Sequence, residues 1–454
     1  MNNATELSSN LPLFYIIGFV LTCILAIEAF TKTKKQVWSI PALAVYATVG
    51  IWYFVELIYT PENFAKFEGE IIENSFFQVI IFLISFRICL AFTYKTFMKN
   101  AKITASDLSF KPGKLLQYIA IIWLCLLLYG ISRLNGDVIG ALFPINARAG
   151  VNMWQRAAGA DAGATGFIVS TAGYIYLLVC SFFCILLPLQ TKNSAKLFNL
   201  LLILISLPYF ALQGSRNQLL AVVLPGYFSY AIFAKNKVWV KILFTVVTYL
   251  VINYVFTIII EYRNIGLTAV FEQGEQAKNT GIEEKHKGLN MLEELCYINS
   301  FNQQGTLQIT YGMDYVAEMA NVIPRAIWPD KPLIGIEYAK LRGFGGGKSD
   351  IGVTATIATG LIGQGIVNFG ADLGPVAPAF LMALWASFLS RLWLQRYSVL
   401  RLCLFLAGVG TTFNLGRNFT LLVLWPIVFG YVLVRFLEKR GRKRNLSWRY
   451  RSSL

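Results

Sequence analysis

The stretch 321–332, NVIPRAIWPDKP, has the residue types of a rigid anion-binding loop. Its three prolines and one tryptophan favour a fixed, non-helical path next to a bilayer surface, so Arg325 and Lys331 are held in set positions. An arginine fork matches phosphate oxygens in bidentate fashion, and lysine adds a second positive charge. The stretch therefore has the chemistry to bind a phosphate or pyrophosphate group.

The residues that follow extend this pattern. Arg342 stands directly before the glycine run GFGGG at 343–347, which has Gly345 at its centre. A glycine-rich backbone lets amide groups approach an anion closely, and Arg342 adds a further guanidinium group. Together with Arg325 and Lys331, these residues predict a pyrophosphate clamp. The alternative is a proline-stiffened loop that only carries surface charges.

A further cationic candidate lies in the tight turn GSRNQ at 214–218, between two apolar segments. Arg216, with Asn217 beside it, is expected at the outer surface of the membrane that the helices span. There it either extends its charge to the interface, as arginine does at the end of a membrane helix, or binds an anion. The residue types alone do not choose between these two roles.

Four carboxylates near the predicted clamp are candidates for a general base, namely Asp314, Glu318, Asp330 and Glu337. Their spacing does not choose among them, and we take Glu337 as the catalytic candidate. His286 is the only histidine. A neutral imidazole would suit a base, but the charged run EEKHKG around it favours a solvated position.

The elements that must position these residues are membrane helices. The chain has 454 residues, of which 56% are hydrophobic and 14% are charged, and its mean hydropathy is +0.56. Apolar stretches of about 20 residues, each able to span a hydrocarbon core of about 30 Å, recur along it. They predict an all-α, polytopic bundle of about 11 transmembrane helices, at 11–30, 37–59, 76–97, 115–131, 167–189, 197–212, 219–233, 238–260, 373–394, 400–415 and 419–436.

Lysines and arginines in the short connections predict the orientation, because they accumulate on the cytoplasmic side. Lys32, Lys34 and Lys35 place the first connection inside and the N-terminus outside, and the alternation holds through eight spans. The predicted organisation is therefore eight helices in 1–260, a large periplasmic loop at 261–351, a re-entrant or protein-buried glycine-rich segment at 352–372, three helices in 373–436 and a basic cytoplasmic tail at 437–454.

The glycine-rich segment 352–370 is apolar enough to be drawn as a further span. If it crossed the membrane, Arg391, Arg396 and Arg401 would lie outside, against the positive-inside rule. Its glycines and its low content of Leu and Phe also suit a helix shielded from lipid by protein. We therefore expect that it does not cross.

The formal net charge of +16 does not indicate nucleic-acid binding, because the basic residues lie between apolar spans and in the tail. One charge lies inside a span. Arg87 is near the middle of its apolar stretch, where a lone charge costs about 2.5–3.5 kcal/mol, so we expect it to pair with Glu28 or Glu56.

Six of the seven cysteines lie in apolar stretches, and Cys296 is the exception. A single loop cysteine cannot form a disulfide within that loop, and no CxxC or Cys/His cluster indicates a metal or other cofactor site. Because Cys296 lies in the polar loop, we expect a membrane-impermeant thiol reagent to reach it if the loop exposes it.

The order of these motifs resembles Wzy-type O-antigen polymerases, the polysaccharide repeat-unit polymerases of bacterial inner membranes. The shared pattern is a GSR turn between two spans, a large outer loop with PRxxWPDKP at 324–332, and a glycine-rich apolar segment ending in NFG at 368–370. It covers about 197–374. The acidic residue that the family often has as GE before NFG is absent, because this chain reads Gly363-Gln364.

The resemblance implies an inverting, metal-independent glycosyltransferase that uses undecaprenyl-pyrophosphate-linked oligosaccharides. Arg216 and Arg325 would bind the donor pyrophosphate, with Arg342 as a third. It also implies membrane lipids, a chain-length regulator and a flippase as partners, and no cofactor. Two alternatives stay open. They are a related ligase, which differs in its acceptor, and a transporter of lipid-linked glycans, which would be expected to show internal repeats.

Overall fold

The computed structural model describes residues 11–33, 35–99, 111–145, 152–154, 164–213, 216–262, 290–320, 323, 327–328, 330, 332, 335–343, 348–349, 352–353, 358–396, 398–419 and 423–437. Before the large loop, its helices are α2 (Leu13–Thr31), α3 (Ser39–Val49), the π-helix η1 (Gly50–Phe54), α4 (Val55–Tyr59), the 3₁₀-helix η2 (Pro61–Phe64), α5 (Gly69–Met98), α6 (Pro112–Arg133), α7 (Val138–Leu142), α8 (Ala164–Leu186), the 3₁₀-helix η3 (Leu187–Leu189), α9 (Asn193–Leu212), α10 (Arg216–Phe233) and α11 (Val238–Tyr262). After it come α14 (Met291–Gln303), α15 (Met313–Ala320), α16 (Ile336–Leu341), α17 (Leu361–Leu373), α18 (Val376–Leu394), α19 (Val399–Leu415) and a last helix, Val423–Leu437.

Every one of the predicted spans coincides with a helix. Among the described residues, 8 helices are long and apolar enough to cross a membrane. The chain is thus a polytopic helical membrane protein by length and composition, as predicted. Helix α10 is not among the 8, because it begins with the polar residues Arg216, Asn217 and Gln218. The last two helices, Val399–Leu415 and Val423–Leu437, are shorter, so the count of 11 spans stays a prediction.

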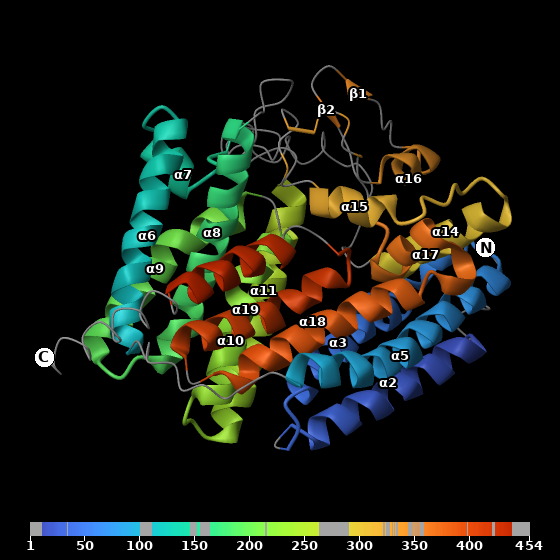
Figure 1. Ribbon diagram of the computed structural model, residues 1–454, viewed down its shortest axis with the longest axis horizontal. Coiled ribbons are helices and arrows are strands. Elements are labelled where there is room, and N and C mark those ends of the chain that lie inside the picture. The colour runs from blue at the N-terminus through green and yellow to red at the C-terminus, as the bar shows by residue number, and fades with distance from the viewer. Residues whose placement is uncertain are drawn as a thin grey trace, which may run out of the picture.

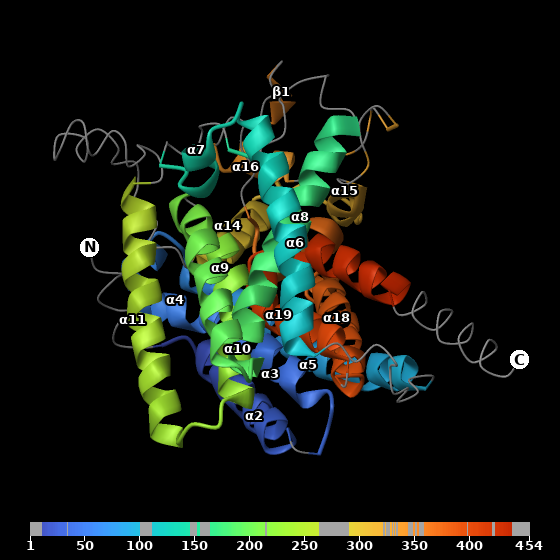
Figure 2. The same ribbon diagram turned by 90° about the vertical axis from the view of Figure 1, so that its left-hand side faces the viewer.

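The helices form two groups (Figures 1 and 2). In the first group, α5 packs on α18 and α2, and α2 also packs on α3. In the second group, α8 packs on α6, α9 and α10. Helix α19 joins the groups, since it contacts α3 and α18 on one side and α8 and α10 on the other. Helices α7, α15 and α16 and strand β1 gather at one end of the molecule (Figures 1 and 2).

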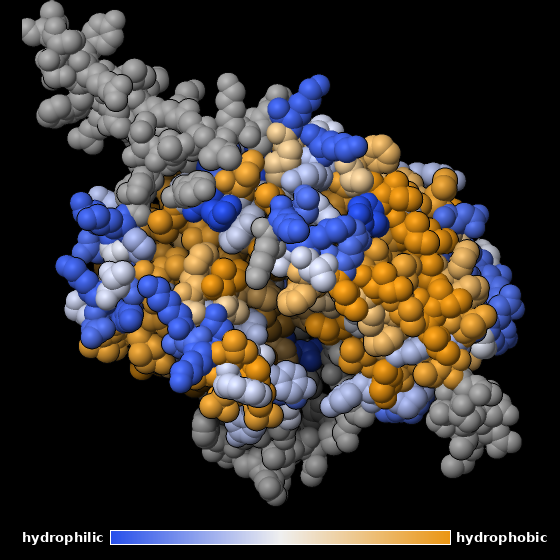
Figure 3. Space-filling view, turned by 90° about the horizontal axis from the view of Figure 1, so that it is seen from below, coloured by the Kyte–Doolittle hydropathy of each residue, from blue (hydrophilic) through white to orange (hydrophobic). Residues whose placement is uncertain are grey.

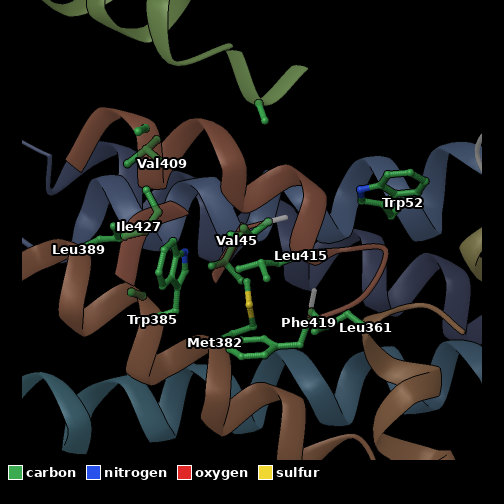
Figure 4. Packing of buried hydrophobic residues seen from close by; sticks show 14 of the residues in the cluster. Val45, Trp52, Leu361, Met382, Trp385, Leu389, Val409, Leu415, Phe419 and Ile427 are labelled. Carbon is green, nitrogen blue, oxygen red and sulfur yellow. The ribbon is translucent and has the colours of Figure 1, made fainter. Parts of the chain in front are cut away.

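The core between the groups is packed from helices far apart in the sequence. Figure 4 shows Val45 of α3, Met382 of α18 and Leu415 of α19 side by side among fully or nearly fully buried neighbours. Close approach there depends on small residues, as is usual between membrane helices. A Cβ atom at Gly410 of α19 would lie 2.5 Å from the ring of Pro225 in α10.

The surface has the apolar character of a lipid-facing protein. Hydrophobic residues cover broad areas of the face seen in Figure 3. Helix α11 is the extreme case, because its apolar span Val238–Thr257 is not buried. Side chains such as Trp239 and Leu243 are 79% and 64% exposed. Apolar surfaces of this extent are unstable in water but suit a bilayer.

The region predicted as a polar loop, 261–351, is partly a folded element of the bundle. Helix α14 buries Met291, Leu292 and Leu295 completely or almost completely against α5, α17 and η1. A pair of two-residue antiparallel strands, β1 (Lys348–Ser349) and β2 (Gly352–Val353), is the one departure from the all-α prediction within the described residues. The periplasmic location of this region stays a prediction.

The glycine-rich segment contains α17, a helix of 13 residues whose residues are mostly buried. At about 1.5 Å per residue it is about 20 Å long, which is shorter than the hydrocarbon core. Its glycines allow a sharp return of the chain. Gly370 has φ +80°, and a Cβ atom at Gly365 would lie 2.1 Å from the carbonyl oxygen of Gly374. That the segment does not cross the membrane stays a prediction.

Arg87 pairs with Glu28, which confirms the expected ion pair. Its Nη2 lies 2.9 Å from Glu28 Oε1, and its Nε lies 3.2 Å from Glu28 Oε2. The other candidate partner, Glu56, is fully buried and accepts hydrogen bonds from the backbone of α14 instead. Arg87 therefore has a partner within the first group of helices, where it joins α5 to α2.

Candidate functional site

The turn that carries Arg216 is bonded to the end of α19. The side-chain Nδ2 of Asn414 donates to the carbonyl oxygen of Asn217 at 3.1 Å. The guanidinium carbon of Arg216 lies 5.9 Å from the ring centre of Phe256 in α11, a cation–π distance. The side chains of Arg216 and Asn217 are half-buried. The first predicted ligand thus lies where α10, α11 and α19 meet.

The end of α19 is bonded in turn to α17. The carbonyl oxygen of Gly416 accepts from the backbone N of Leu361 at 3.0 Å. The side-chain Oε1 of Gln364 accepts from the backbone N of Phe419 at 3.0 Å. Gln364 is 2% exposed. Its side chain joins the first turn of α17 to the turn after α19.

The π-helix η1 supports the start of α17. Its wider turn is typical of functional sites, and two consecutive side chains, Trp52 and Tyr53, bond to different elements. The hydroxyl of Tyr53 accepts from the backbone N of Ile362 at 3.0 Å, and Trp52 Nε1 donates to the carbonyl of Phe413 at 2.8 Å. The second predicted span therefore holds both α17 and the end of α19.

Asn368, the first residue of the NFG motif, binds α17 to the start of α15. It is fully buried. Its Oδ1 accepts from the hydroxyl of Thr310 at 3.0 Å and from the backbone N of Asp314 at 3.2 Å, while its Nδ2 donates to the carbonyl oxygen of Gln364 at 2.7 Å. A buried amide with all of these bonds positions two helices with respect to each other.

Asp314 completes the path to the proline-rich loop. Its Oδ1 accepts from the backbone N of Gly335 at 3.4 Å. Burial raises the pKa of Asp314, and the backbone of Gly335 and the hydroxyl of Thr310 lower it in part. Because α16 begins after Gly335, Asp314 joins the first turn of α15 to the residue at which the loop between the two helices ends.

Arg342 lies at the opposite end of α16, in a largely buried ion pair. Its Nε lies 3.1 Å from Glu294 Oε2, and its guanidinium carbon lies 3.5 Å from the ring centre of Tyr297. The hydroxyl of Tyr338 donates to the same Glu294 carboxylate. The side chains of Arg342 and Glu294 are 12% and 2% exposed. The structure therefore gives Arg342 an internal partner, and its binding to a pyrophosphate stays a prediction.

Several predicted site residues lie outside the described residues. They are Arg325, Lys331 and Gly345, together with His286. Glu337 lies in α16, but its side chain is not described. The structure thus brings the Arg216 turn, the glycine-rich segment and the base of the proline-rich loop into one network.

Cys296 does not meet the condition for labelling, which was exposure by the loop. It is fully buried in α14, and its sulfur lies 3.5 Å from the hydroxyl of Ser75 in α5. Burial raises the pKa of its thiol to about 12. The polar residues around Cys296 in the sequence bond to partners within the bundle, as Glu293 does to Lys66 and Glu294 to Arg342.

Sequence reasoning missed the asparagines that connect these elements. Asn414 is 2% exposed, and its Oδ1 has no hydrogen-bond partner within the described part of the chain. Asn418 is also buried and accepts from Thr359 at 3.2 Å. A signal was available, because asparagine within an apolar membrane segment is costly without a partner. Asn414 was missed because its position near the end of a short helix makes it resemble a turn residue.

The comparisons with known proteins add no further information. No family model matches the chain, and no curated protein or solved structure is significantly similar to it.

Proposed function

We propose that the chain is a membrane glycosyltransferase that polymerises oligosaccharide repeat units carried on undecaprenyl pyrophosphate. The reaction takes place at the periplasmic face of the bacterial inner membrane. Arg216 and Arg325 bind the donor pyrophosphate, which is the leaving group. Arginine neutralises the charge that grows on it, so this step needs no metal ion. Lys331, Asn217 and the glycine run around Gly345 are further ligands in this proposal.

The observation that carries the proposal is the hydrogen-bonded path described above. It runs from Asn217 through Asn414 and the turn after α19 to Gln364, and then through Asn368 and Asp314 to Gly335. The path joins the turn of Arg216 to the base of the loop that contains Arg325. Membrane proteins bury polar groups in this number chiefly where they serve a function, which supports a site here.

The apolar surface supports a substrate that stays in the membrane. Arg216 lies at the polar start of α10, beside Phe256 of the exposed helix α11. A phosphate group at a helix start next to a lipid-facing helix can be bound while its polyprenyl chain remains in the bilayer. A donor linked to a lipid thus fits this position better than a soluble sugar nucleotide does.

The test uses a strain from which the gene has been deleted, with each variant restored at equal membrane abundance. Polymer length is measured on extracted glycolipid. Arg216→Ala and Arg325→Ala should slow transfer by about ten- to a few-hundredfold, since one charge-assisted hydrogen bond is worth about 1.5–3 kcal/mol. The lysine variants should be intermediate, because lysine keeps the charge and loses the planar fork.

Arg396→Ala is the matched control. Arg396 follows the end of α18, whereas α17 of the network precedes the start of that helix, and the guanidinium carbon of Arg396 lies 4.7 Å from the Trp393 ring centre. Its loss should leave polymer length unchanged. Long polymer from Arg216→Ala and Arg325→Ala at normal abundance would refute the proposed function.

A further inference from the structure

Four carboxylates lie near the proline-rich loop, and they differ in their surroundings. Glu318 is buried in α15, with 6% of its surface exposed, which leaves a sugar little access. Asp330 is exposed to the surroundings. The side chain of Glu337 is outside the described residues. Asp314 is half-buried, so it is shielded from bulk water and still has an accessible edge.

Among the described residues, the groups that face Asp314 are uncharged. The loop before α16 presents the backbone N of Gly335, the turn before α15 presents the hydroxyl of Thr310, and α17 presents the amide of Asn368. Tyr315 is the adjacent titratable group, and its pKa is raised by burial and then by the charge of Asp314. No cation among these neighbours offsets the burial that makes the Asp314 carboxylate more basic.

We infer that Asp314 is the general base that accepts the proton of the acceptor hydroxyl, an inference that rests on the glycosyl transfer proposed above. The acceptor oxygen attacks the anomeric carbon of the donor sugar as its proton passes to the carboxylate of Asp314. The bond from that carbon to the pyrophosphate oxygen breaks, and its electron pair leaves with the pyrophosphate. Asp314 then returns the proton to water.

The hydrogen bonds of the site suit this role. Asn368 holds the backbone at Asp314, and Gly335 holds one carboxylate oxygen, so within the described part of the chain the side chain is held by uncharged groups. The same contacts link the base to the loop that contains Arg325. An acceptor hydroxyl bound at Asp314 would therefore lie at the base of the loop that binds the leaving group.

The experiment measures release of undecaprenyl pyrophosphate by the full-length protein in nanodiscs. The donor is the lipid-linked oligosaccharide that accumulates in the deletion strain. The wild-type rate should rise with pH and level off, because only the carboxylate form of Asp314 accepts a proton. Asp314→Asn should be about 100- to 10,000-fold slower, with little remaining pH dependence. Asp137→Asn, a change of the same chemistry at an exposed site outside the loop, should leave the rate unchanged.

Two further measurements separate catalysis from folding and from donor binding. Asp314→Asn should keep the wild-type Tm or exceed it, since an amide is easier to bury than a carboxylate. It should also bind undecaprenyl pyrophosphate as the wild type does, whereas Arg216→Ala should bind it more weakly. If Asp314→Asn does not fold, Asp314→Glu provides the test. It keeps a carboxylate, so its transfer rate should still rise with pH but should be lower than that of the wild type.

Each outcome bears on a different claim. Full-rate transfer by Asp314→Asn beside a slow Arg216→Ala would overturn the role of Asp314 and leave the proposed function standing. A pH profile of Asp314→Glu that is flat at the wild-type rate would also overturn it. Absence of any transfer by the wild type, with donor present and the protein folded, would overturn both.

Discussion

Helices α14 and α15 belong to the same polar region of the sequence but have opposite surroundings. Helix α14 is enclosed by the bundle, and both Glu293 and Glu294 are buried, with 4% and 2% of their surfaces exposed. Helix α15 buries Ala317 and turns Met313 and Val316 outward, with 49% and 44% exposed. A charged residue on α14 therefore needs an internal partner, while α15 keeps one accessible side.

The difference shows how the site is supported. Helix α14 has its first amide groups bound by Glu56, at 2.7 Å to Leu292 N, and its side chains bound by Lys66 and Arg342. It behaves as a fixed element of the core. Helix α15 is held mainly at its first turn, by Asn368. Stability should therefore depend on α14, and transfer should depend on the start of α15.

The largest contrast should appear in thiol reactivity. Cys296 of α14 should react with a maleimide about a thousandfold more slowly than a cysteine introduced at Tyr311, before α15. Cys296 is fully buried with a thiol pKa raised to about 12, whereas Tyr311 is 82% exposed. An exposed thiol has a pKa of about 8.5, and only the thiolate reacts. Site-resolved mass spectrometry of the folded protein measures both rates.

The same variant tests the orientation. An impermeant reagent should label Tyr311→Cys in intact spheroplasts if the loop is periplasmic. Labelling only after the membrane is opened would reverse the predicted topology. Rapid labelling of Cys296 in the folded protein would instead show that α14 is not part of the core.

A large loss of stability should follow from Glu294→Ala. This change leaves the guanidinium of Arg342 buried without its carboxylate and removes the acceptor of Tyr338. Breaking a buried ion pair costs about 3–5 kcal/mol. Thermal unfolding in detergent measures the change. Val316→Ala, on the exposed side of α15, is the control and should alter stability by about 0.5 kcal/mol or less. Equal effects of the two changes would contradict the difference between the helices.

A smaller loss should follow from Gln364→Ala in the network itself. The backbone N of Phe419 would lose its acceptor in a buried position, which costs about 1–3 kcal/mol. Transfer should fall as well, because the turn after α19 also positions Asn414 against the Arg216 turn. Gln304→Ala, at the exposed end of α14, is the matched control for both readouts. An unchanged Tm and rate in Gln364→Ala would mean that the network does not organise the site.

The smallest effect should come from Lys66→Met. Lys66 pairs with Glu293 at 2.5 Å, but its side chain is 43% exposed. Water can therefore reach the Glu293 carboxylate when the ammonium group is removed, and we expect a loss of about 1 kcal/mol or less. Burial lowers the pKa of Lys66, but the bonds to Glu293 and Tyr297 outweigh it and leave the pKa raised. The contribution should persist up to the ordinary lysine pKa, about 10.4, and be lost as the pH rises through the folded-state value. The stability of the wild type and of Lys66→Met is measured by urea or thermal unfolding at pH 7 and above pH 11. A loss of stability as large as that of Glu294→Ala would contradict the ranking.

Much of the fold could be predicted from local patterns. The long apolar runs determine where helices form in a membrane, because each run must satisfy its own backbone hydrogen bonds there. The same reasoning required a partner for Arg87, and Glu28 provides it. The candidate site was predicted less completely. Arg216, Asn217 and Arg342 are described, and the structure adds Asn414, Gln364 and Asn368 as the residues that connect the site.

The sequence by itself determined the helical membrane architecture and the chemistry available at its polar turns, since length, hydropathy and residue type are local properties. Only the tertiary structure decided which polar residues meet. Leu292 and Glu56 are bonded across 236 positions, and Asn414 and Asn217 across 197. The partner of a buried polar group depends on how distant helices pack, and that geometry decided that Cys296 is buried and that Arg342 pairs with Glu294.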